Sequence, residues 1–400
     1  MEPTLVVIGL NHHTAPIAVR ERFWMSERRQ RDALTALARS EGIEEVVVFS
    51  TCNRTEFVAW GDPTLAENSV LRFLAAEYDL KLCEWSNFYR LLDEQALAHA
   101  FRVSCGLDSM HIGEGQIGRQ VNEAWQQARQ LGCTGRFLDA TLRKALAVRR
   151  RVRKETSTRF NLESAPQAAV ELAGGIFGSL AQCNVVLLGA GRMSEASAQA
   201  LRNRGVNSVC IVSHSDGKAR ELGCRLGVQA AAFEERWTRL VAADLAISAT
   251  SATGFVLTAA EMTRVVARRE GRELLLMDLA LPRDVDPGVR QLEGILLYDL
   301  DNLEQALQPR AGVRESEARA EQIALDEARE FMKELIADDA GAGIGALRHQ
   351  LDEICQQELD SFRLEQGPFP KDQDQLIAAV GTRITHKIAG SLARTLGSRP

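Results

Sequence analysis

The stretch Val185-Val186-Leu187-Leu188-Gly189-Ala190-Gly191-Arg192-Met193-Ser194 joins an apolar run to a glycine-containing turn and a helix-like segment. Glycine at 189 and 191 permits a tight strand-to-helix turn, in which backbone N–H groups at the helix start can bind a pyrophosphate. A G-x-G alone is a weak pattern, and Ser194 stands where the dinucleotide fingerprint has Gly or Ala. Its position at the opening of a strand–helix unit favours a dinucleotide site, formed by the six residues from Gly189 to Ser194.

The sequence around this loop alternates strand-like and helix-like segments from about residue 163 to 310. The predicted strands are 185–188, 209–212, 245–248, 274–277 and 295–297. Strands that alternate with helices form a parallel sheet, which predicts a Rossmann-like nucleotide domain over residues 163–310.

The residues that follow the second of these strands bear on the choice of cofactor. An NAD enzyme usually has an Asp or Glu there for the ribose hydroxyls, whereas this chain has Ser213-His214-Ser215. Asp216 comes later, and Lys218 and Arg220 follow it. A 2′-phosphate is therefore the better-matched ligand, and we expect NADPH; in the alternative interpretation Asp216 only caps the next helix.

The N-terminal part, residues 1–156, has a different pattern. Short strand-like runs at 5–8, 46–49 and 57–60 alternate with helical stretches at 26–39 and 63–78. Helical patterns follow at 94–105 and in one long segment, 116–154. This order predicts a small α+β domain.

The C-terminal part, residues 311–400, is helical in pattern. Apolar residues recur there every three or four positions, as at Ala320, Ile323, Ala324, Phe331 and Leu335, and again from Leu347 to Ile354. An amphipathic helix must bury its apolar stripe against a partner surface. The only loop-like composition is Ala340-Gly341-Ala342-Gly343, which we expect between two helices.

Composition excludes several classes of protein. The chain has 400 residues, enough for two or three domains, with 45% apolar and 26% charged residues, as in ordinary globular proteins. The eight cysteines form no C-x-x-C pair, which argues against a structural zinc site and a disulfide scaffold; we predict no metal site. The N-terminus has neither a basic leader nor a long apolar run, and we expect a cytoplasmic protein.

The net charge of −6 does not indicate a nucleic-acid binder, although it can conceal a local basic patch. Residues 149–154 form the densest basic run in the chain. Two interpretations of this run stay open: a solvated helix face and a local patch that binds an anionic partner.

Cys52 lies in the run Ser50-Thr51-Cys52-Asn53-Arg54-Thr55-Glu56, directly after an apolar strand. A cysteine in that place is more often a small buried hydrophobe. Its neighbours Thr51, Asn53, Arg54 and Glu56 are not typical of the packing around an inert thiol, and a guanidinium two residues away can stabilise a thiolate. A thiolate combined with a nicotinamide cofactor indicates thioester chemistry followed by hydride delivery.

Four separated segments closely resemble the signature segments of glutamyl-tRNA reductases. They are Gly9-Leu10-Asn11-His12-His13-Thr14-Ala15-Pro16 with Arg20-Glu21, then Ser50 to Glu56, then Gly106-Leu107-Asp108-Ser109 with Gly113-Glu114, and Asp278-Leu279-Ala280-Leu281-Pro282-Arg283-Asp284-Val285. They occur in the family's order and span nearly the whole chain. The resemblance implies a multi-domain α/β protein: an N-terminal α+β catalytic domain, a Rossmann-like nucleotide domain and a C-terminal helical dimerisation domain.

The resemblance also implies a reaction. Cys52 would attack the ester that joins glutamate to its tRNA, and NADPH would reduce the resulting thioester to glutamate-1-semialdehyde, the precursor of 5-aminolevulinate and tetrapyrroles. His99 would assist this activity. Substrate contacts carried over by position are Thr51, Asn53, Arg54, Ser109, Glu114, Gly115, Gln116 and Gln120. The implied partners are tRNA charged with glutamate, a second copy of the chain and glutamate-1-semialdehyde aminomutase.

From the chemistry of the side chains we infer two roles. Arg54 suits the γ-carboxylate of the substrate, and Glu114 suits the α-ammonium.

The sequence departs from the family pattern at residues 115–119, 156–166, 213–215 and 387–388. Three interpretations therefore compete. The first is the tRNA-dependent reductase; the second is a paralogue that reduces another aminoacyl ester or thioester. The third is a non-catalytic binding or regulatory homologue, which the intact segment Thr51-Cys52-Asn53-Arg54 argues against.

Overall fold

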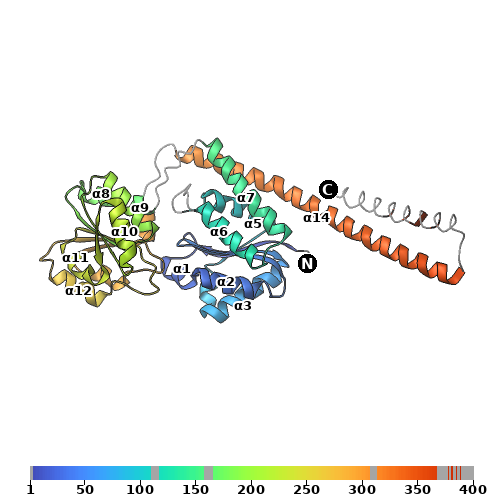
Figure 1. The fold of residues 1–400 in the computed structure, drawn as a ribbon, viewed down its shortest axis with the longest axis horizontal. Helices are drawn as coiled ribbons and strands as arrows, with labels where there is room; N and C mark the ends of the chain where they lie inside the picture. Colours follow the sequence, from blue (N-terminus) through green and yellow to red (C-terminus); the bar gives the residue numbers. More distant parts are fainter. Residues whose placement is uncertain are drawn as a thin grey trace. The chain divides into compact units, whose positions relative to one another are not determined.

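The structure is a computed structural model that describes residues 3–109, 117–156, 165–306 and 313–366, with single positions between 377 and 388. It consists of two compact units, residues 1–326 and 327–400. The first unit contains two β-sheets, each with its own helices (Figure 1).

The first sheet has four antiparallel strands in the order β2-β3-β1-β4. The strands are β1 (Thr4–Asn11), β2 (Ile43–Ser50), β3 (Arg54–Gly61) and β4 (Tyr89–Leu92). The three strands predicted in this region are confirmed. The fourth, β4, was missed because Tyr89-Arg90-Leu91-Leu92 is short and leads directly into a helix.

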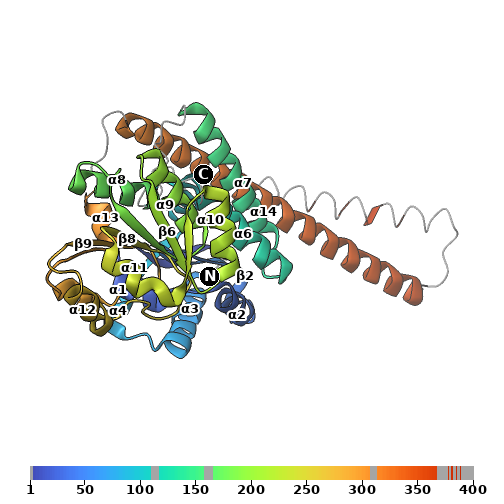
Figure 2. The same ribbon diagram turned by 60° about the vertical axis from the view of Figure 1, so that its left-hand side comes forward.

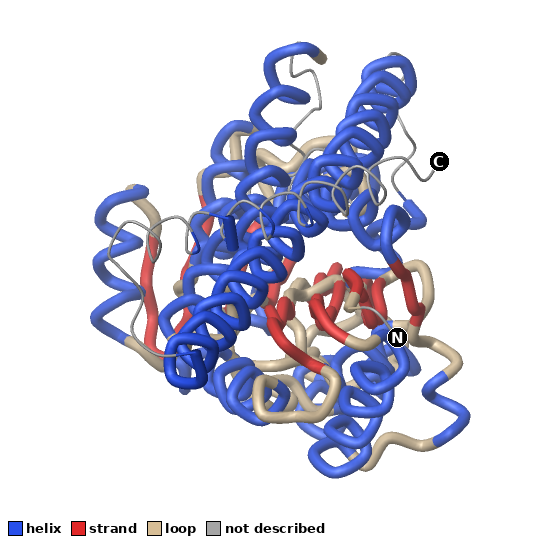
Figure 3. The backbone as a smooth tube through the Cα atoms, turned by 90° about the vertical axis from the view of Figure 1, so that its right-hand side faces the viewer, coloured by secondary structure: helices blue, strands red, loops and turns tan. Residues whose placement is uncertain are grey.

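Helices cover both faces of this sheet. Figure 1 shows α2 and α3 on one face and α5, α6 and α7 on the other, and Figure 3 shows the strands between these helical layers. The helices are α1 (Ile17–Phe23), α2 (Glu27–Leu37), α3 (Pro63–Tyr78), α4 (Leu82–Trp85), α5 (Asp93–Cys105), α6 (Ile117–Gln130) and α7 (Arg136–Glu155). Sheet residues are buried along the whole length of β1 after Thr4, as expected for a sheet covered on both faces.

The long helix predicted over 116–154 is in fact two helices, α6 and α7. Gly132 adopts φ +68°, a left-handed conformation that glycine tolerates and that ends α6. The N–H of Cys133 returns to the carbonyl of Ala128, and α7 begins after Gly135. This break turns the chain, so that α6 and α7 both pack against α5.

The basic run at 149–154 forms the last turns of α7. Arg149 donates to the carbonyl of Ser104, and Arg151 pairs with Glu155 at 2.6 Å. Part of this run therefore serves the packing and the solvated face of the helix.

The second sheet has six parallel strands in the order β10-β9-β8-β5-β6-β7. They are β5 (Asn184–Leu188), β6 (Ser208–Ser213), β7 (Gln229–Ala232), β8 (Leu245–Ser248), β9 (Leu274–Asp278) and β10 (Ile295–Tyr298). The five predicted strands and the Rossmann-like sheet are confirmed. Strand β7 was missed because Gln-Ala-Ala-Ala has low β propensity and is paired only at the sheet edge.

Strand alternation divides the core of this sheet in two. Val185 and Leu187 pack with residues of α8, α9 and α10, whereas Val186 and Leu188 pack with residues of α11 and α12. Successive side chains of a strand point to opposite faces, so a continuous apolar run fits a sheet buried on both sides. Figure 2 shows these helices around the sheet. The helices are α8 (Ala165–Phe177), α9 (Arg192–Asn203), α10 (Asp216–Leu226), α11 (Arg236–Ala242), α12 (Ala259–Ala267) and α13 (Leu300–Ala306), with short 3₁₀ turns at Phe233–Glu235 and Pro287–Gln291.

Helix α14 (Val313–Gln366) forms the last long element. The loop predicted at Ala340–Gly343 is wrong, because the helix continues through these residues. Two glycines cost roughly 1 kcal/mol each in a helix interior, too little to break a helix of this length. Ala320, Ile323 and Ala324 of the predicted apolar stripe are buried. Within the described residues, no helix has the length and apolarity needed to span a membrane.

Candidate active site

Cys52 lies at the tip of the hairpin that joins β2 to β3. The two strands stay paired up to Ser50 and Thr55, and the N–H of Thr51 donates to the carbonyl of Arg54 at 2.8 Å. Cys52 and Asn53 therefore form a two-residue loop, and the thiol is half-buried. The hairpin thus holds the thiol at the end of a rigid sheet, outside its core.

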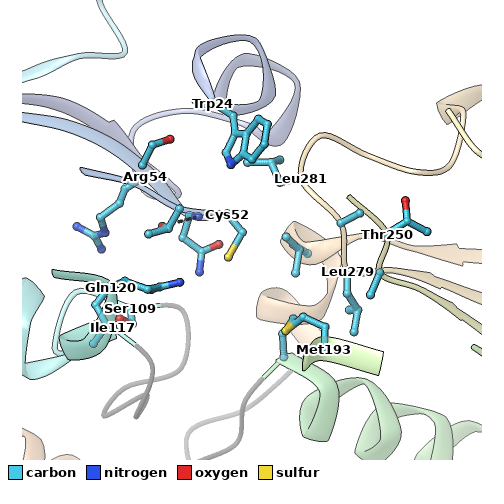
Figure 4. A pocket seen from close by; sticks show the side chains of 17 residues that line it. Trp24, Cys52, Arg54, Ser109, Ile117, Gln120, Met193, Thr250, Leu279 and Leu281 are labelled. Carbon is cyan, nitrogen blue, oxygen red and sulfur yellow. Dashed lines mark hydrogen bonds between the residues drawn. The ribbon is translucent and has the colours of Figure 1, made fainter. Parts of the chain in front are cut away.

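A pocket of about 310 Å³ surrounds this tip. Figure 4 shows Cys52 between two sets of side chains: Arg54, Ser109 and Gln120 on one side, and Met193 and Leu279 on the other. The first set comes from the N-terminal sheet and its helices, and the second from the parallel-sheet part. The pocket therefore brings the cysteine next to the nucleotide-binding fold.

Ion pairs fix these two parts of the first unit to each other. Arg20 pairs with Asp301 at 2.7 Å, and Arg283 pairs with Glu21 at 2.6 Å. The N–H of Ile17 also donates to Asp301. Arg20, Glu21 and Arg283 belong to the signature segments, whose residues here hold the two walls of the pocket together.

The guanidinium of Arg54 is buried, with 1% of its side chain exposed. Its Nη1 contacts Glu56 Oε1 at 2.7 Å and Asp108 Oδ2 at 2.8 Å, and its Nη2 donates to the backbone oxygen of Asp108. The Nε atom is buried and has no hydrogen-bond partner among the described residues. Arg54 thus has two carboxylate partners and one donor that the described structure leaves unused.

The stabilisation of a Cys52 thiolate by Arg54, expected from their nearness in sequence, stays a prediction. The contacts of Arg54 are with Glu56 and Asp108, and Figure 4 shows its side chain and that of Cys52 pointing in different directions. Residues two apart on an extended strand share a face, but the hairpin loop ends this alternation at Cys52.

His99 belongs to the same buried network but does not line the pocket. Its Nε2 lies 2.9 Å from Glu56 Oε1, and the Tyr89 hydroxyl donates to the same oxygen at 2.5 Å. One carboxylate oxygen therefore contacts Arg54, His99 and Tyr89. His99 is thus linked to the pocket-lining Arg54 through their shared contact with Glu56.

Burial and the neighbouring charges act in opposite directions on the pKa values of this network. Burial disfavours the ionised form of Glu56, but the charges of His99 and Arg54 outweigh it and hold its pKa well below the usual range. Burial would likewise lower the pKa of Arg54, but Glu56 and Asp108 raise it. For Asp108 burial is again outweighed by Arg54, and its pKa is lowered. The network therefore retains a guanidinium and two carboxylates.

The glycine loop lies where the sequence predicts, between β5 and α9. Gly189 has φ +105°, and a Cβ there would lie 2.5 Å from the carbonyl oxygen of Ala249. A Cβ at Gly191 would meet open space, which leaves room for a ligand at the start of α9. Ser194 is buried, its Oγ 3.3 Å from the Cβ position at Gly189, so the serine fits where the fingerprint has Gly or Ala. The loop therefore fits a dinucleotide phosphate.

Two loops complete the pocket wall at the carboxyl ends of β8 and β9. Asp284 accepts hydrogen bonds from Ser248 Oγ at 2.7 Å and from Thr250 Oγ1 at 2.5 Å. Asp278 accepts from the N–H groups of Ala280 and Val285. Burial, with a further contribution from the charge of Asp284, raises the pKa of Asp278 to about 8. These contacts hold Thr250 and residues 279–281 in the positions in which they line the pocket.

The structure brings together most of the site residues predicted from the sequence. Those that line the pocket are Thr51, Cys52, Asn53, Arg54, Ser109, Gln120 and Met193. Gly189, Ala190, Gly191, Arg192 and Ser194 lie beside it in the turn and first residues of α9. Glu114, Gly115 and Gln116 lie outside the described residues.

Other lining residues had not been predicted. They are Trp24, Ser50, Ile117, Ala165, Ala249, Thr250, Leu279, Ala280, Leu281 and Leu300. Leu279 to Leu281 belong to a signature segment to which no site role was assigned, so the segment itself was the available signal. Trp24 and Leu300 follow ordinary helical patterns and carry no signal of their own.

Three models of known protein families match successive parts of the chain. Residues 8–156 match the family model of the glutamyl-tRNAGlu reductase N-terminal domain, and residues 319–398 match that of its dimerisation domain. Residues 171–306 match the model of shikimate / quinate 5-dehydrogenase.

Individual relatives agree with these matches. A glutamyl-tRNA reductase of Desulforudis audaxviator is 39% identical over 358 residues, which are 89% of this chain and 80% of the relative. Glutamyl-tRNA reductase 2 of Koribacter versatilis is 35% identical over 98% of this chain and 89% of the relative. The solved glutamyl-tRNA reductase from Methanopyrus kandleri superposes with a TM-score of 0.53 at 26% identity and covers 98% of this chain and 94% of its own. The chain belongs to the glutamyl-tRNA reductase family.

Proposed function

We propose that this protein reduces glutamate esterified to its tRNA, releasing glutamate-1-semialdehyde, through a thioester on Cys52. The observation that carries the proposal is the position of Cys52: a half-buried thiol at a hairpin tip, in a pocket whose other wall belongs to a dinucleotide-binding fold. A thiol that served packing alone would need neither the pocket nor the buried polar network beside it.

The acyl step uses residues of this chain. The Cys52 sulfur attacks the ester carbonyl carbon, a C–S bond forms, and the C–O bond to the ribose breaks. The departing ribose oxygen takes a proton, and the glutamyl group remains on the protein as a thioester. The half-buried site limits access of water, which protects the thioester from hydrolysis.

When bound, NADPH would supply the hydride that reduces the thioester to the aldehyde, which frees the Cys52 sulfur. The residues that would hold it are Gly189 to Ser194 at the start of α9, where Gly191 faces open space. Met193, Thr250 and Leu279 line the pocket between this turn and Cys52. They would contact the nicotinamide end of the cofactor.

Two unused polar atoms suit the glutamyl group. Arg54 Nε and Asn53 Oδ1 are buried without hydrogen-bond partners among the described residues, and both side chains line the pocket. A buried polar atom without a partner costs about 1–3 kcal/mol, a cost that a bound ligand removes. We assign Arg54 Nε to the γ-carboxylate and Asn53 Oδ1 to the α-ammonium. Glu114 lies outside the described residues, and its role toward that ammonium stays a prediction. His99 is proposed as a positioning residue that acts through Glu56.

The direct test of the function is an aldehyde assay with several charged tRNAs. The protein is incubated with NADPH and glutamyl-tRNA, and in parallel with tRNAs that carry other amino acids. Aldehyde from glutamyl-tRNA alone would support the proposal. Aldehyde from a different charged tRNA, or from none, would contradict it.

We expect NADPH to be preferred over NADH. Asp216, the nearest acid after β6, pairs with Arg220 at 2.6 Å, so its carboxylate is already engaged and does not favour a free ribose hydroxyl. His214 and Lys218 remain near the strand end as donors to a 2′-phosphate. The kcat/KM for each cofactor measures the preference. His214→Arg should raise it about tenfold, since a guanidinium binds phosphate in a bidentate manner.

A preference for NADH in the wild type would show that Asp216 reaches the ribose. Arg225→Lys, in the last turn of α10, serves as the control and should leave the ratio of the two kcat/KM values unchanged.

We propose that the chain forms a homodimer through its C-terminal helices. Ile354 is 55% exposed and Phe362 is 42% exposed on α14, although large apolar side chains normally avoid water. Ile354→Asp with Phe362→Asp should give a folded monomer in analytical ultracentrifugation, whereas the exposed control Gln357→Asp should leave the wild-type state. A dimer that survives the double substitution would place the interface elsewhere.

The remaining assignments follow from the proposed reaction. We keep the division of the chain into residues 1–156, 163–310 and 311–400 as catalytic, nucleotide and dimerisation regions. The reaction belongs in the cytoplasm, where charged tRNA is made and used. A glutamate-1-semialdehyde aminomutase would consume the reactive aldehyde, and we propose it as a partner for that reason.

A further inference from the structure

A second hollow, here called the amide cleft, lies beside the pocket that contains Cys52. Its volume is about 430 Å³, and α2 and α6 supply most of its lining. Six of its twelve lining residues carry carboxamides: Gln30, Gln120, Asn122, Gln126, Gln127 and Gln130. Ser50 and Gln120 line both hollows, so the cleft is adjacent to the site of acyl transfer.

The hydrogen bonds divide these carboxamides into two groups. Gln30 Nε2 donates to the carbonyl of Met25 at 3.0 Å, and Gln127 Nε2 donates to that of Glu27 at 3.2 Å. These two are held by the backbone. The side chains of Asn122, Gln126 and Gln130 make no hydrogen bond with any residue that the structure describes.

The unused carboxamides share one side of a helix. Asn122, Gln126 and Gln130 follow one another at intervals of four residues on α6, which places them on the same face. Each carboxamide offers one acceptor and two donors. The cleft therefore presents a row of paired donors and acceptors.

The charges of the cleft exclude a phosphate as its main ligand. Arg31 is its one cation among the lining residues, and Glu27 and Glu123 are two anions. Phosphate contacts need an excess of Lys and Arg. A neutral ligand with alternating donors and acceptors fits better, and Asn or Gln forms bidentate hydrogen bonds with adenine. Single-stranded RNA ends are commonly bound in this way, through their base edges.

We propose that the amide cleft binds the 3′-terminal adenosine of the charged tRNA, with Asn122 and Gln126 bonding the edge of its base. The inference rests on the proposed function, in which the glutamyl ester is attached to the ribose of that adenosine. With the glutamyl group beside Cys52 and Arg54, the ribose must leave the pocket on a side free of the nucleotide fold. The cleft adjoins the pocket at Ser50 and Gln120, which come from β2 and α6 of the N-terminal part and not from the nucleotide fold.

The experiment compares three acyl donors. One is glutamyl-tRNA, the second is the same tRNA with a terminal purine riboside that lacks the 6-amino group, and the third is a small glutamyl α-thioester without a nucleoside. Acyl transfer to the protein is measured as kcat/KM for the wild type, for the double variant Asn122→Ala with Gln126→Ala, and for Asn68→Ala. Asn68 is an exposed amide on α3 that lines neither hollow, and it serves as the matched control.

For the wild type, kcat/KM for acyl transfer should fall about tenfold when the 6-amino group is removed, as expected for one lost bidentate contact. For the double variant, kcat/KM with normal glutamyl-tRNA should be about tenfold below that of the wild type. Removing the 6-amino group should not lower it further. Its reaction with the small thioester should stay within twofold of the wild type, which also shows that the variant is folded. Asn68→Ala should match the wild type with all three donors.

Two results would overturn the inference: a wild type indifferent to the 6-amino group, or a double variant that loses as much with the small thioester as with the tRNA. A wild type that reacts with none of the three glutamyl donors would instead contradict the proposed function itself. The reaction with the small thioester distinguishes a failure of the inference from a failure of the proposed function.

Discussion

Replacing Cys52 by Ser should lower aldehyde formation from glutamyl-tRNA and NADPH by at least about 10³-fold. A serine hydroxyl is scarcely ionised near neutral pH, whereas a free thiol is already a few per cent thiolate and is intrinsically more nucleophilic. Removal of the nucleophile in other covalent enzymes costs up to about 10⁶-fold in turnover. Serine is nearly isosteric, and Cys52 is only half-buried, so the fold should persist.

The other cysteines provide the control for this prediction. Cys224 is exposed on α10 and lines no part of the pocket, so Cys224→Ser should keep wild-type turnover. Burial raises the pKa of the Cys105 thiol to about 12, which leaves it protonated and unreactive. Turnover that survives in Cys52→Ser at more than a few per cent would assign Cys52 to packing.

Arg54→Lys should lower kcat/KM for glutamyl-tRNA by at least tenfold, which corresponds to about 1.4 kcal/mol or more. Lysine keeps the charge but has no counterpart to Nε, the buried donor assigned to the substrate. It also cannot reproduce the separate contacts of Nη1 and Nη2 with Glu56 and Asp108. We therefore expect the free energy of unfolding to fall by about 1–3 kcal/mol.

Urea unfolding separates the two effects of this substitution. Arg90→Lys is the matched control, since Arg90 pairs with Glu67 at a partly exposed position and neither residue lines the pocket. It should change neither turnover nor stability by more than a few tenths of a kcal/mol. Wild-type turnover in folded Arg54→Lys would remove Arg54 from the substrate site.

Strong sequence patterns predicted most of the fold. The β5 run of Val and Leu residues followed by Gly189 and Gly191 indicates a buried strand and a phosphate-binding turn, and the structure has both. Helix α3 was predicted with its observed bounds, because Pro63 follows the capping side chain of Asp62, which accepts from Thr64 and Leu65. Local chemistry fixes such boundaries, so one sequence is enough to find them.

Other features depend on contacts between distant segments. Strand β7 consists of Gln229-Ala230-Ala231-Ala232, and only its pairing with β6 makes it a strand. The α6–α7 break depends on one glycine, Gly132, whose left-handed φ no periodicity reveals. In both places the tertiary context decides the local structure.

The site also combines features that follow from local sequence with features that depend on contacts between distant segments. The segment around Cys52 indicated a reactive thiol from its polar neighbours alone. The pairing of Arg54 with Asp108 could not be predicted, because Asp108 is 54 positions away and is brought to it by the packing of α5 on the sheet. The lining by Thr250 likewise depends on Asp284, 34 positions further along the chain.

The most direct test of the central claim is to trap the acyl-protein without cofactor. The wild type is mixed with glutamyl-tRNA in the absence of NADPH, quenched in acid and digested, and the peptides are mapped by mass spectrometry. The proposed mechanism predicts a glutamyl group on Cys52 that disappears, with release of aldehyde, when NADPH is added. A glutamyl group on another residue, or aldehyde formation from a protein that never carries one on Cys52, would contradict it.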